Sequence, residues 1–256
     1  MQKEKAIIFD LDGTAIDSPG QKLPSKELVR AADNLKNEYY LSAATGRVWT
    51  FAKPVLQALG LTDPSIISAG TQICDPKTGE ILWQRNIPEK SLEQVMTILQ
   101  TNPDYKLLFN DSTEDDYFHG GITPKEFSHK EPVYFLEQVF VPDSVAVPLY
   151  EKLSKVDGVA CVMVVAQKPG CRDIHILNEH ATKEHAVGEL LNMLHVENKN
   201  SIGIGDSHND VHLFNAVGHR VAMGNSIPEL KAAADVVIGS VEDDGLAQYF
   251  NSLLHK

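Results

Sequence analysis

Short apolar segments alternate with amphipathic segments at both ends of this chain of 256 residues. The run KAIIFD, residues 5–10, has no polar alternation, which is typical of a strand buried on both faces of a parallel sheet. The next segment has apolar residues at helical spacing, and strand-like and helix-like segments continue in turn to about residue 60. Such alternation indicates right-handed β-α-β units, so we expect an α/β fold with a doubly wound, mostly parallel sheet.

The alternation stops after SIISAG, residues 65–70, and resumes at TKEHAVGELL, residues 182–191. The sequence between them reads as hairpins, strands and helices of an α+β unit of about a hundred residues, which is an ordinary domain size. We therefore predict a core formed by 1–81 and 183–256 and an inserted domain at 82–182. Two Ser-x-x-Glu/Gln patterns, at Ser91 and Ser226, predict capping boxes at helix starts.

Charge and cysteine content limit the classes of function. The formal net charge of −12 argues against binding to nucleic acid or to an anionic membrane, because both require a basic face. Three scattered cysteines without a CxxC pair favour a reducing compartment. The chain has no secretory pattern at its start and no run of 18 apolar residues. We expect a soluble cytoplasmic protein.

Polar residues cluster after three of the predicted strands. Asp10 and Asp12 follow the first strand, the triplet Thr45, Gly46 and Arg47 follows the second, and DSHND, residues 206–210, follows SIGIG. Each cluster alone can be a helix cap or an ordinary strand-to-helix turn. Ligands in open α/β sheets bind at the carboxyl ends of the strands, so the three clusters together predict one site at that edge.

Competing motifs do not fit these residues. The segment at Asp10 lacks the glycine that an EF-hand requires at its sixth loop position, and GIGDSH has His208 where a dinucleotide fingerprint requires glycine. The chain has no GxxxxGK[ST] motif of a P-loop. His208 and His212 have the spacing of a metal pair on a helix, but without a third ligand pattern surface histidines are favoured.

Carboxylates without a cysteine or a clear histidine ligand suit a hard cation, and Mg²⁺ fits a site that also binds phosphate oxygens. Asp10 can attack phosphorus, because an ionised carboxylate needs no base. Asp12 can protonate the leaving oxygen and then accept a proton from the attacking water. Thr45 and a lysine can stabilise charge on the phosphoryl oxygens, and Lys183 is the candidate, although a lysine there is ordinarily an exposed helical residue.

The chain resembles the haloacid dehalogenase superfamily, and within it the Cof-type, class IIB sugar-phosphatase-like hydrolases. FDLDGT, ATGR, the lysine of ATKEHAVGELL, IGDSHNDVHLF and the C-terminal segment from VAMGNS carry the resemblance, which covers essentially the whole core. It implies a Rossmann-like core with a C2-type cap that closes over the site and excludes water.

The resemblance also implies roles for individual residues. Asp10 is the expected nucleophile and Asp12 the expected acid/base. The expected Mg²⁺ ligands are Asp10, the main-chain carbonyl of Asp12, and Asp206, with Asp210 supporting them. The expected substrate-binding residues are Thr45, Gly46, Arg47, Lys183 and Asn209.

The chain departs from the family pattern at Ala69, where relatives often carry asparagine, and in its weakly matching cap. Near the end of the cap, the residues Arg172, Asp173 and His175 stand where the family places groups that face the substrate. Arg172 is a candidate for a second anionic group of the substrate, and a salt bridge within the cap is an equal alternative.

We therefore expect a Mg²⁺-dependent phosphatase that hydrolyses a small organic phosphate monoester, such as a phosphosugar, through an aspartyl-phosphate. A phosphosugar mutase on the same scaffold and a non-catalytic sugar-phosphate-binding regulator are the alternatives. The expected partner is a small phosphorylated molecule, with no nucleic acid and no membrane. The sequence leaves the identity of the metabolite and the oligomeric state open.

Overall fold

The computed structural model describes residues 3–17, 23–101, 105–112 and 132–254. Its contacts divide the chain into two compact units, one comprising Met1–Trp83 with Lys183–Lys256 and the other comprising Gln84–Thr182. The predicted insertion at 82–182 ends at the same residue as the second unit. Its first residue differs from that of the second unit by two positions.

The first unit contains a parallel sheet, which in the described residues has the strand order β12-β11-β10-β1-β2. All neighbouring strands are parallel, which confirms the predicted fold class. In the register, Phe9 of β1 lies opposite Ala43 of β2 and Ile204 of β10, so these strands end at the same edge. The strands are β1 (Lys5–Phe9), β2 (Tyr39–Ala43), β10 (Ser201–Gly205), β11 (His219–Ala222) and β12 (Val236–Val237).

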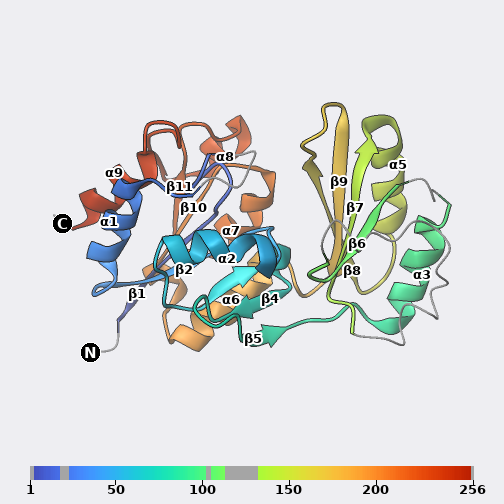
Figure 1. Ribbon diagram of the computed structural model, residues 1–256, viewed down its shortest axis with the longest axis horizontal. Helices are drawn as coiled ribbons and strands as arrows, with labels where there is room; N and C mark the ends of the chain where they lie inside the picture. The colour runs from blue at the N-terminus through green and yellow to red at the C-terminus, as the bar shows by residue number, and fades with distance from the viewer. Residues whose placement is uncertain (1–2, 18–22, 102–104, 113–131, 255–256) are drawn as a thin grey trace. The chain divides into compact units, whose positions relative to one another are not determined.

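Helices cover both faces of this sheet (Figure 1). Ile7 and Phe9 pack into one hydrophobic core and Ala6 and Ile8 into the other, because successive side chains of a strand point to opposite faces. This double burial explains the continuous apolar run in β1. The first core includes α1 (Lys26–Leu35), α2 (Trp49–Ala58) and α9 (Gly245–Leu253), and the second includes α6 (Lys183–Leu194), α7 (Val211–Asn215) and α8 (Pro228–Ala233).

A small sheet of the order β3-β4-β5 extends from the edge of the core, where Ala44 forms a parallel bridge with Ile66. Its strands are β3 (Ser65–Ile67), β4 (Gln72–Cys74) and β5 (Ile81–Gln84). β3 and β4 are antiparallel, and the turn after β4 is closed by a hydrogen bond from Asp75 N to Glu80 O of 2.9 Å. This turn corresponds to the expected hairpin.

The second unit contains an antiparallel sheet whose described strands have the order β6-β7-β9-β8. Its hydrophobic core joins alternate residues of the sheet, such as Ile174 and Ile176, to helix residues such as Val95 and Leu149. The elements are α3 (Glu89–Leu99), β6 (Leu107–Phe109), β7 (Phe135–Pro142), α5 (Asp143–Leu153), β8 (Val159–Val165) and β9 (Cys171–Asn178).

Both predicted capping boxes are wrong. The helix α3 begins at Glu89, before Ser91, and the Ser91 hydroxyl donates to Asp157 O at 2.6 Å. The helix α8 begins at Pro228 after an N-cap Ile227, and the buried Ser226 hydroxyl donates to Gly205 O at 3.1 Å. Tertiary partners therefore engage both serine hydroxyls, which the local pattern cannot indicate.

The three cysteines, Cys74, Cys161 and Cys171, are free thiols. Burial raises the pKa of Cys74 and of Cys161 to about 12, so both thiols are protonated at neutral pH. In the described part of the chain, no helix is both long enough and apolar enough to span a membrane.

The pKa of Asp173 in β9 generates a prediction for the stability of the second unit. Burial raises this pKa from 3.8 to about 6, and Glu137 raises it further, although the Phe140 amide, at 2.7 Å from Oδ1, and His175 oppose the shift. The folded state therefore holds a proton that the unfolded state releases between pH 4 and pH 6. The contribution of protonated Asp173 to the free energy of unfolding is therefore fully present below pH 4 and is lost as pH rises through 6.

We expect the variant Asp173→Asn to become more stable relative to the unmodified protein as pH rises from 4 to 7, because asparagine does not titrate and retains the Phe140 bond. Urea denaturation at each pH measures the difference. A difference that stays constant across this range would contradict a raised pKa at Asp173.

Candidate active site

The carboxylate of Asp10 is buried at the end of β1, with a side chain that is 5% exposed. Its backbone amide donates to Ile204 O at 2.9 Å and so continues the pairing of β1 with β10. Lys183, the first residue of α6, donates from Nζ to Asp10 Oδ1 at 2.7 Å. Lys183 is 3% exposed, so this lysine is a buried partner of the carboxylate and not a surface residue.

A second buried carboxylate, Asp210, binds the same lysine. Lys183 Nζ donates to Asp210 Oδ1 at 2.8 Å, and Asp210 Oδ2 accepts the amides of Asp206 and Ser207 at 3.0 Å each. Asp210 thereby fixes the lysine with one oxygen and the loop after β10 with the other. The DSHND segment does form a local turn, but its last carboxylate is buried and faces the site, unlike an exposed helix cap.

Asp206 completes the cluster from the end of β10. Thr14 Oγ1 donates to Asp206 Oδ1 at 3.1 Å. Gly13 has a φ of 80°, and a Cβ there would lie 2.3 Å from Asp206 Oδ2, so only glycine fits beside this carboxylate. Asn225 donates to Gly13 O at 2.8 Å and accepts the Val241 amide at 3.0 Å, which ties this turn to the C-terminal loops.

Sequence reasoning assigned no role to Thr14 or to Asn225. Thr14 lies within FDLDGT, so its position in the motif was a usable signal. Asn225 follows β11 at the same edge of the sheet, so the rule that ligands bind at the carboxyl ends of the strands also points to this residue.

Among the described residues, oxygen atoms of Asp10, Asp206 and Asp210 lie within 4.8 Å of one another. Burial raises the pKa of Asp10 well above 3.8, and Asp210 and Asp206 raise it further against the opposing effect of Lys183. Burial and Asp210 raise the pKa of Asp206 to about 7. Burial lowers the pKa of Lys183, but Asp10 and Asp210 outweigh burial and raise it overall.

These residues fit a hard divalent cation. Three carboxylates lie close to one lysine, so negative charge exceeds positive charge at this site. Burial, and after it the neighbouring carboxylates, raises the pKa values of Asp10 and Asp206. The donor set consists of carboxylate oxygens, which Mg²⁺ prefers over nitrogen and sulfur ligands.

Asp12 forms an ion pair with Arg47. Arg47 Nε donates to Asp12 Oδ2 at 2.8 Å, and Arg47 Nη2 donates to Asp12 Oδ1 at 2.6 Å. The guanidinium therefore binds both carboxylate oxygens in the planar fork geometry typical of arginine. The structure thus places Arg47, which was expected at the substrate, on the side chain of the expected acid/base.

The other expected substrate-binding residues lie around these contacts. Thr45 is buried at the end of β2, and its hydroxyl accepts the Arg47 amide at 3.1 Å. Gly46 separates the two and is half-buried. Asn209 lies in the loop after β10, where its side-chain oxygen accepts the Ser207 hydroxyl.

The residues that were expected to face the substrate from a cap, Arg172, Asp173 and His175, have partners within the second unit. Arg172 donates from Nε to Asp143 Oδ1 at 2.9 Å, so of the two expected alternatives the salt bridge is observed. His175 Nε2 lies 3.1 Å from Glu137 Oε1. Asp173 accepts the Phe140 amide as described above.

Neither His208 nor His212 belongs to the group of possible metal ligands among the described residues, which consists of Asp10, Asp206 and Asp210. His212 Nδ1 lies 3.7 Å from Glu184 Oε2, and His208 is exposed. Surface histidines therefore remain the better interpretation.

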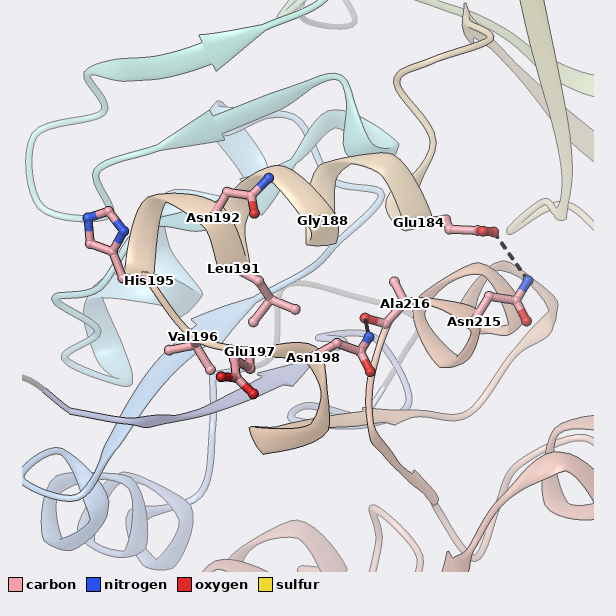
Figure 2. Close-up of a pocket in the computed structure, with 10 residues that line it drawn as sticks. All are labelled: Glu184, Gly188, Leu191, Asn192, His195, Val196, Glu197, Asn198, Asn215 and Ala216. Carbon is pink, nitrogen blue, oxygen red and sulfur yellow. Dashed lines mark hydrogen bonds between the residues drawn. The ribbon is translucent and has the colours of Figure 1, made fainter.

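A separate hollow of about 660 Å³ lies beside α6 (Figure 2). Figure 2 shows Glu184 accepting a hydrogen bond from Asn215 Nδ2, at 3.2 Å, across one end of it. None of the residues that line it belongs to the carboxylate cluster, so the hollow is not the site described here. Its lining residues are Glu184, Gly188, Leu191, Asn192, His195, Val196, Glu197, Asn198, Asn215 and Ala216.

Comparison with known proteins relates this geometry to a family. The family model of haloacid dehalogenase-like hydrolases matches residues 7–250. A curated relative, the 5-amino-6-(5-phospho-D-ribitylamino)uracil phosphatase YwtE of Bacillus subtilis, is 26% identical over 98% of each chain. An HMP-PP phosphatase of Yersinia pseudotuberculosis is 27% identical over 96% of this chain and 94% of its own.

Solved structures share the fold. The phosphatase BT1666 of Bacteroides thetaiotaomicron superposes with a TM-score of 0.79 at 18% identity, covering 98% of this chain and 95% of that one. The subclass IIB sugar phosphatase BT4131 superposes with a TM-score of 0.74 at 18% identity, covering 97% and 98% of the two chains.

The buried pairs of Lys183 generate a prediction. We expect Lys183→Met to lower the free energy of unfolding by about 3–5 kcal/mol, because Asp10 and Asp210 lose their buried cationic partner. Urea denaturation in EDTA at pH 7 measures the loss. Lys199→Met, which removes an exposed pair with Glu197, is the control, and we expect it to change the free energy of unfolding far less than Lys183→Met does. A loss below about 1 kcal/mol for Lys183→Met would contradict the buried pairs.

The loop after β3 generates another prediction. Ala69 has φ 57° and ψ 17°, a left-handed conformation that costs roughly 1–2 kcal/mol for a residue with a Cβ. Its amide donates to Thr45 O at 3.1 Å, which holds the strained loop against the residues after β2.

We expect Ala69→Gly to stabilise the protein by about 0.5–1 kcal/mol, since glycine relieves the strain but gains entropy in the unfolded chain. Thermal denaturation measures the shift. Ala232→Gly, at an exposed position in the last turn of α8, is the control and should destabilise. Equal destabilisation by both variants would show that Ala69 carries no strain.

Proposed function

Since this chain belongs to the haloacid dehalogenase-like hydrolase family, we propose that it is a Mg²⁺-dependent phosphatase of small organic phosphate monoesters. The observation that carries the proposal is the buried Asp10 carboxylate, held by Lys183 and flanked by Asp206 and Asp210. The phosphorylated substrates in the names of the relatives support a phosphosugar or a similar metabolite as the substrate.

We assign the nucleophile to Asp10. Lys183 binds Asp10 Oδ1 and holds that oxygen in place, which leaves the other carboxylate oxygen to attack phosphorus. A P–O bond forms to Asp10 as the bond to the leaving oxygen breaks, which yields an aspartyl-phosphate and an alcohol. Thr45, Gly46 and Asn209 are proposed to bind the phosphoryl oxygens with Lys183.

We assign proton transfer to Asp12. In the first step Asp12 gives a proton to the leaving oxygen, and in the second it takes a proton from the water that attacks the aspartyl-phosphate. The second step breaks the bond between phosphorus and Asp10, releases inorganic phosphate and regenerates the carboxylate. Both groups therefore return to their starting state.

The residues proposed to hold Mg²⁺ are Asp10, Asp206 and the main-chain carbonyl of Asp12, with Asp210 as a supporting group. When bound, Mg²⁺ would neutralise the charge of the phosphate oxygens beside the carboxylates. We further propose that the unit 84–182 is the cap and that the protein acts in the cytoplasm on soluble metabolites, without nucleic acid or membrane partners.

We expect phosphate release from at least one member of a panel of phosphosugars, polyol phosphates and other phosphorylated metabolites with Mg²⁺, and loss of this activity with EDTA. Asp10→Asn should reduce turnover to the assay background, because an amide is not a nucleophile, and should leave the fold intact. Asp235→Asn, at an exposed ion pair with Arg220, is the matched control and should retain activity.

Mass spectrometry of the acid-quenched enzyme should detect a phosphoryl group on Asp10 during turnover. Full Mg²⁺-dependent activity of Asp10→Asn would disprove the assigned nucleophile. Tight binding of phosphosugars by the unmodified protein, without phosphate release or transfer, would instead support a regulatory protein.

A further inference from the structure

We propose, on the basis of the phosphatase function proposed above, that Arg47 is a positioning residue that orients the Asp12 carboxylate for proton transfer. Two hydrogen bonds of 2.6 and 2.8 Å join the guanidinium to the two carboxylate oxygens. A fork of two parallel bonds fixes the plane of a carboxylate, whereas a single contact leaves it free to rotate.

Arg47 is itself held in place from several directions. Its Nη1 donates to Phe51 O, in the first turn of α2, at 3.2 Å. Its amide donates to Thr45 Oγ1 at 3.1 Å, and its carbonyl accepts the Ser68 amide at 2.8 Å. An anchored guanidinium can therefore impose an orientation on Asp12, which is the more exposed partner, with a side chain that is 34% exposed against 15% for Arg47.

The geometry favours this role over binding of the phosphoryl group. A guanidinium recognises phosphate through the same parallel N–H fork that it uses for a carboxylate. In Arg47 the fork of Nε and Nη2 binds Asp12, and Nη1 binds Phe51 O. Phosphate binding through that fork would require Arg47 to release Asp12.

The ion pair is compatible with proton transfer by Asp12. Each carboxylate oxygen has two lone pairs, and a fork of this kind uses one on each oxygen. The remaining lone pairs can carry the proton that passes to the leaving oxygen or arrives from water. Because the fork fixes the carboxylate plane, it also fixes the direction in which these lone pairs point.

Dependence on the leaving group tests the proposal. We expect Arg47→Gln to lower kcat/KM for an alkyl phosphate by about tenfold or more, since a positioned general acid contributes about 10²–10⁴. For p-nitrophenyl phosphate the change should stay below about threefold, because p-nitrophenolate leaves without a proton. The ratio kcat/KM reports the steps up to formation of the aspartyl-phosphate, so a slow second step does not obscure the comparison.

A double-mutant cycle provides a second measurement. In an Asp12→Asn background, Arg47→Gln should have no further effect on kcat/KM for the alkyl phosphate, because Arg47 acts through Asp12. In the otherwise unmodified protein, kcat/KM of Arg47→Lys for the alkyl phosphate should lie between the values of the unmodified enzyme and Arg47→Gln, since an ammonium keeps the charge but cannot form the fork. The variant Arg220→Gln breaks a bidentate pair with Asp235 of the same geometry, at 3.1 and 2.6 Å, and is the matched control, with unchanged activity.

An equal loss for alkyl and p-nitrophenyl phosphates, accompanied by weaker inhibition by inorganic phosphate, would overturn the proposal and assign Arg47 to the phosphoryl group. Additive losses in the Asp12→Asn background would also overturn it. If Arg47→Gln does not fold, as judged by thermal denaturation, Arg47→Lys carries the same comparison. Absence of hydrolysis by the unmodified enzyme would refute the phosphatase function itself, which separates the two failures.

Discussion

The candidate active-site edge of the core depends on the buried ion cluster of Lys183 with Asp10 and Asp210. One ammonium group bonds two carboxylates at 2.7 and 2.8 Å, and all three side chains are almost fully excluded from water. Isolated buried charges are costly, so each member is tolerable only beside the others. The same cluster joins β1, α6 and the loop after β10, and therefore ties the two ends of the chain together at the site.

The cluster is electrostatically incomplete by itself. Asp206 adds a third carboxylate. Burial, together with the neighbouring carboxylates, raises the pKa values of Asp10 and Asp206. Stability is thus reduced locally, in an arrangement that suits a divalent cation and an anionic substrate. Gly13, Thr14 and Asn225 support this arrangement by fitting closely beside Asp206 or by joining the turn after β1 to the loops after β11.

Much of this arrangement was predictable. The continuous apolar run before Asp10 indicated a strand buried on both faces, and the strand-end rule placed Asp10 and Asp206 at one edge. Other predictions failed or were incomplete because they relied on local patterns. Ser91 and Ser226 matched the capping-box pattern, but each hydroxyl bonds a carbonyl that is distant in the chain.

The sequence by itself determined the alternating core, the interruption by a second unit and the acidic character of the strand ends, because periodicity and residue type act through local geometry. Only the tertiary structure decided which partner each charged group has. Lys183 lies 173 residues from Asp10, and Arg47 lies 35 residues from Asp12. A lysine at a helix start and an arginine in a turn are ordinary surface residues until the sheet brings a carboxylate to them, since charge pairing depends on distance in space and on burial.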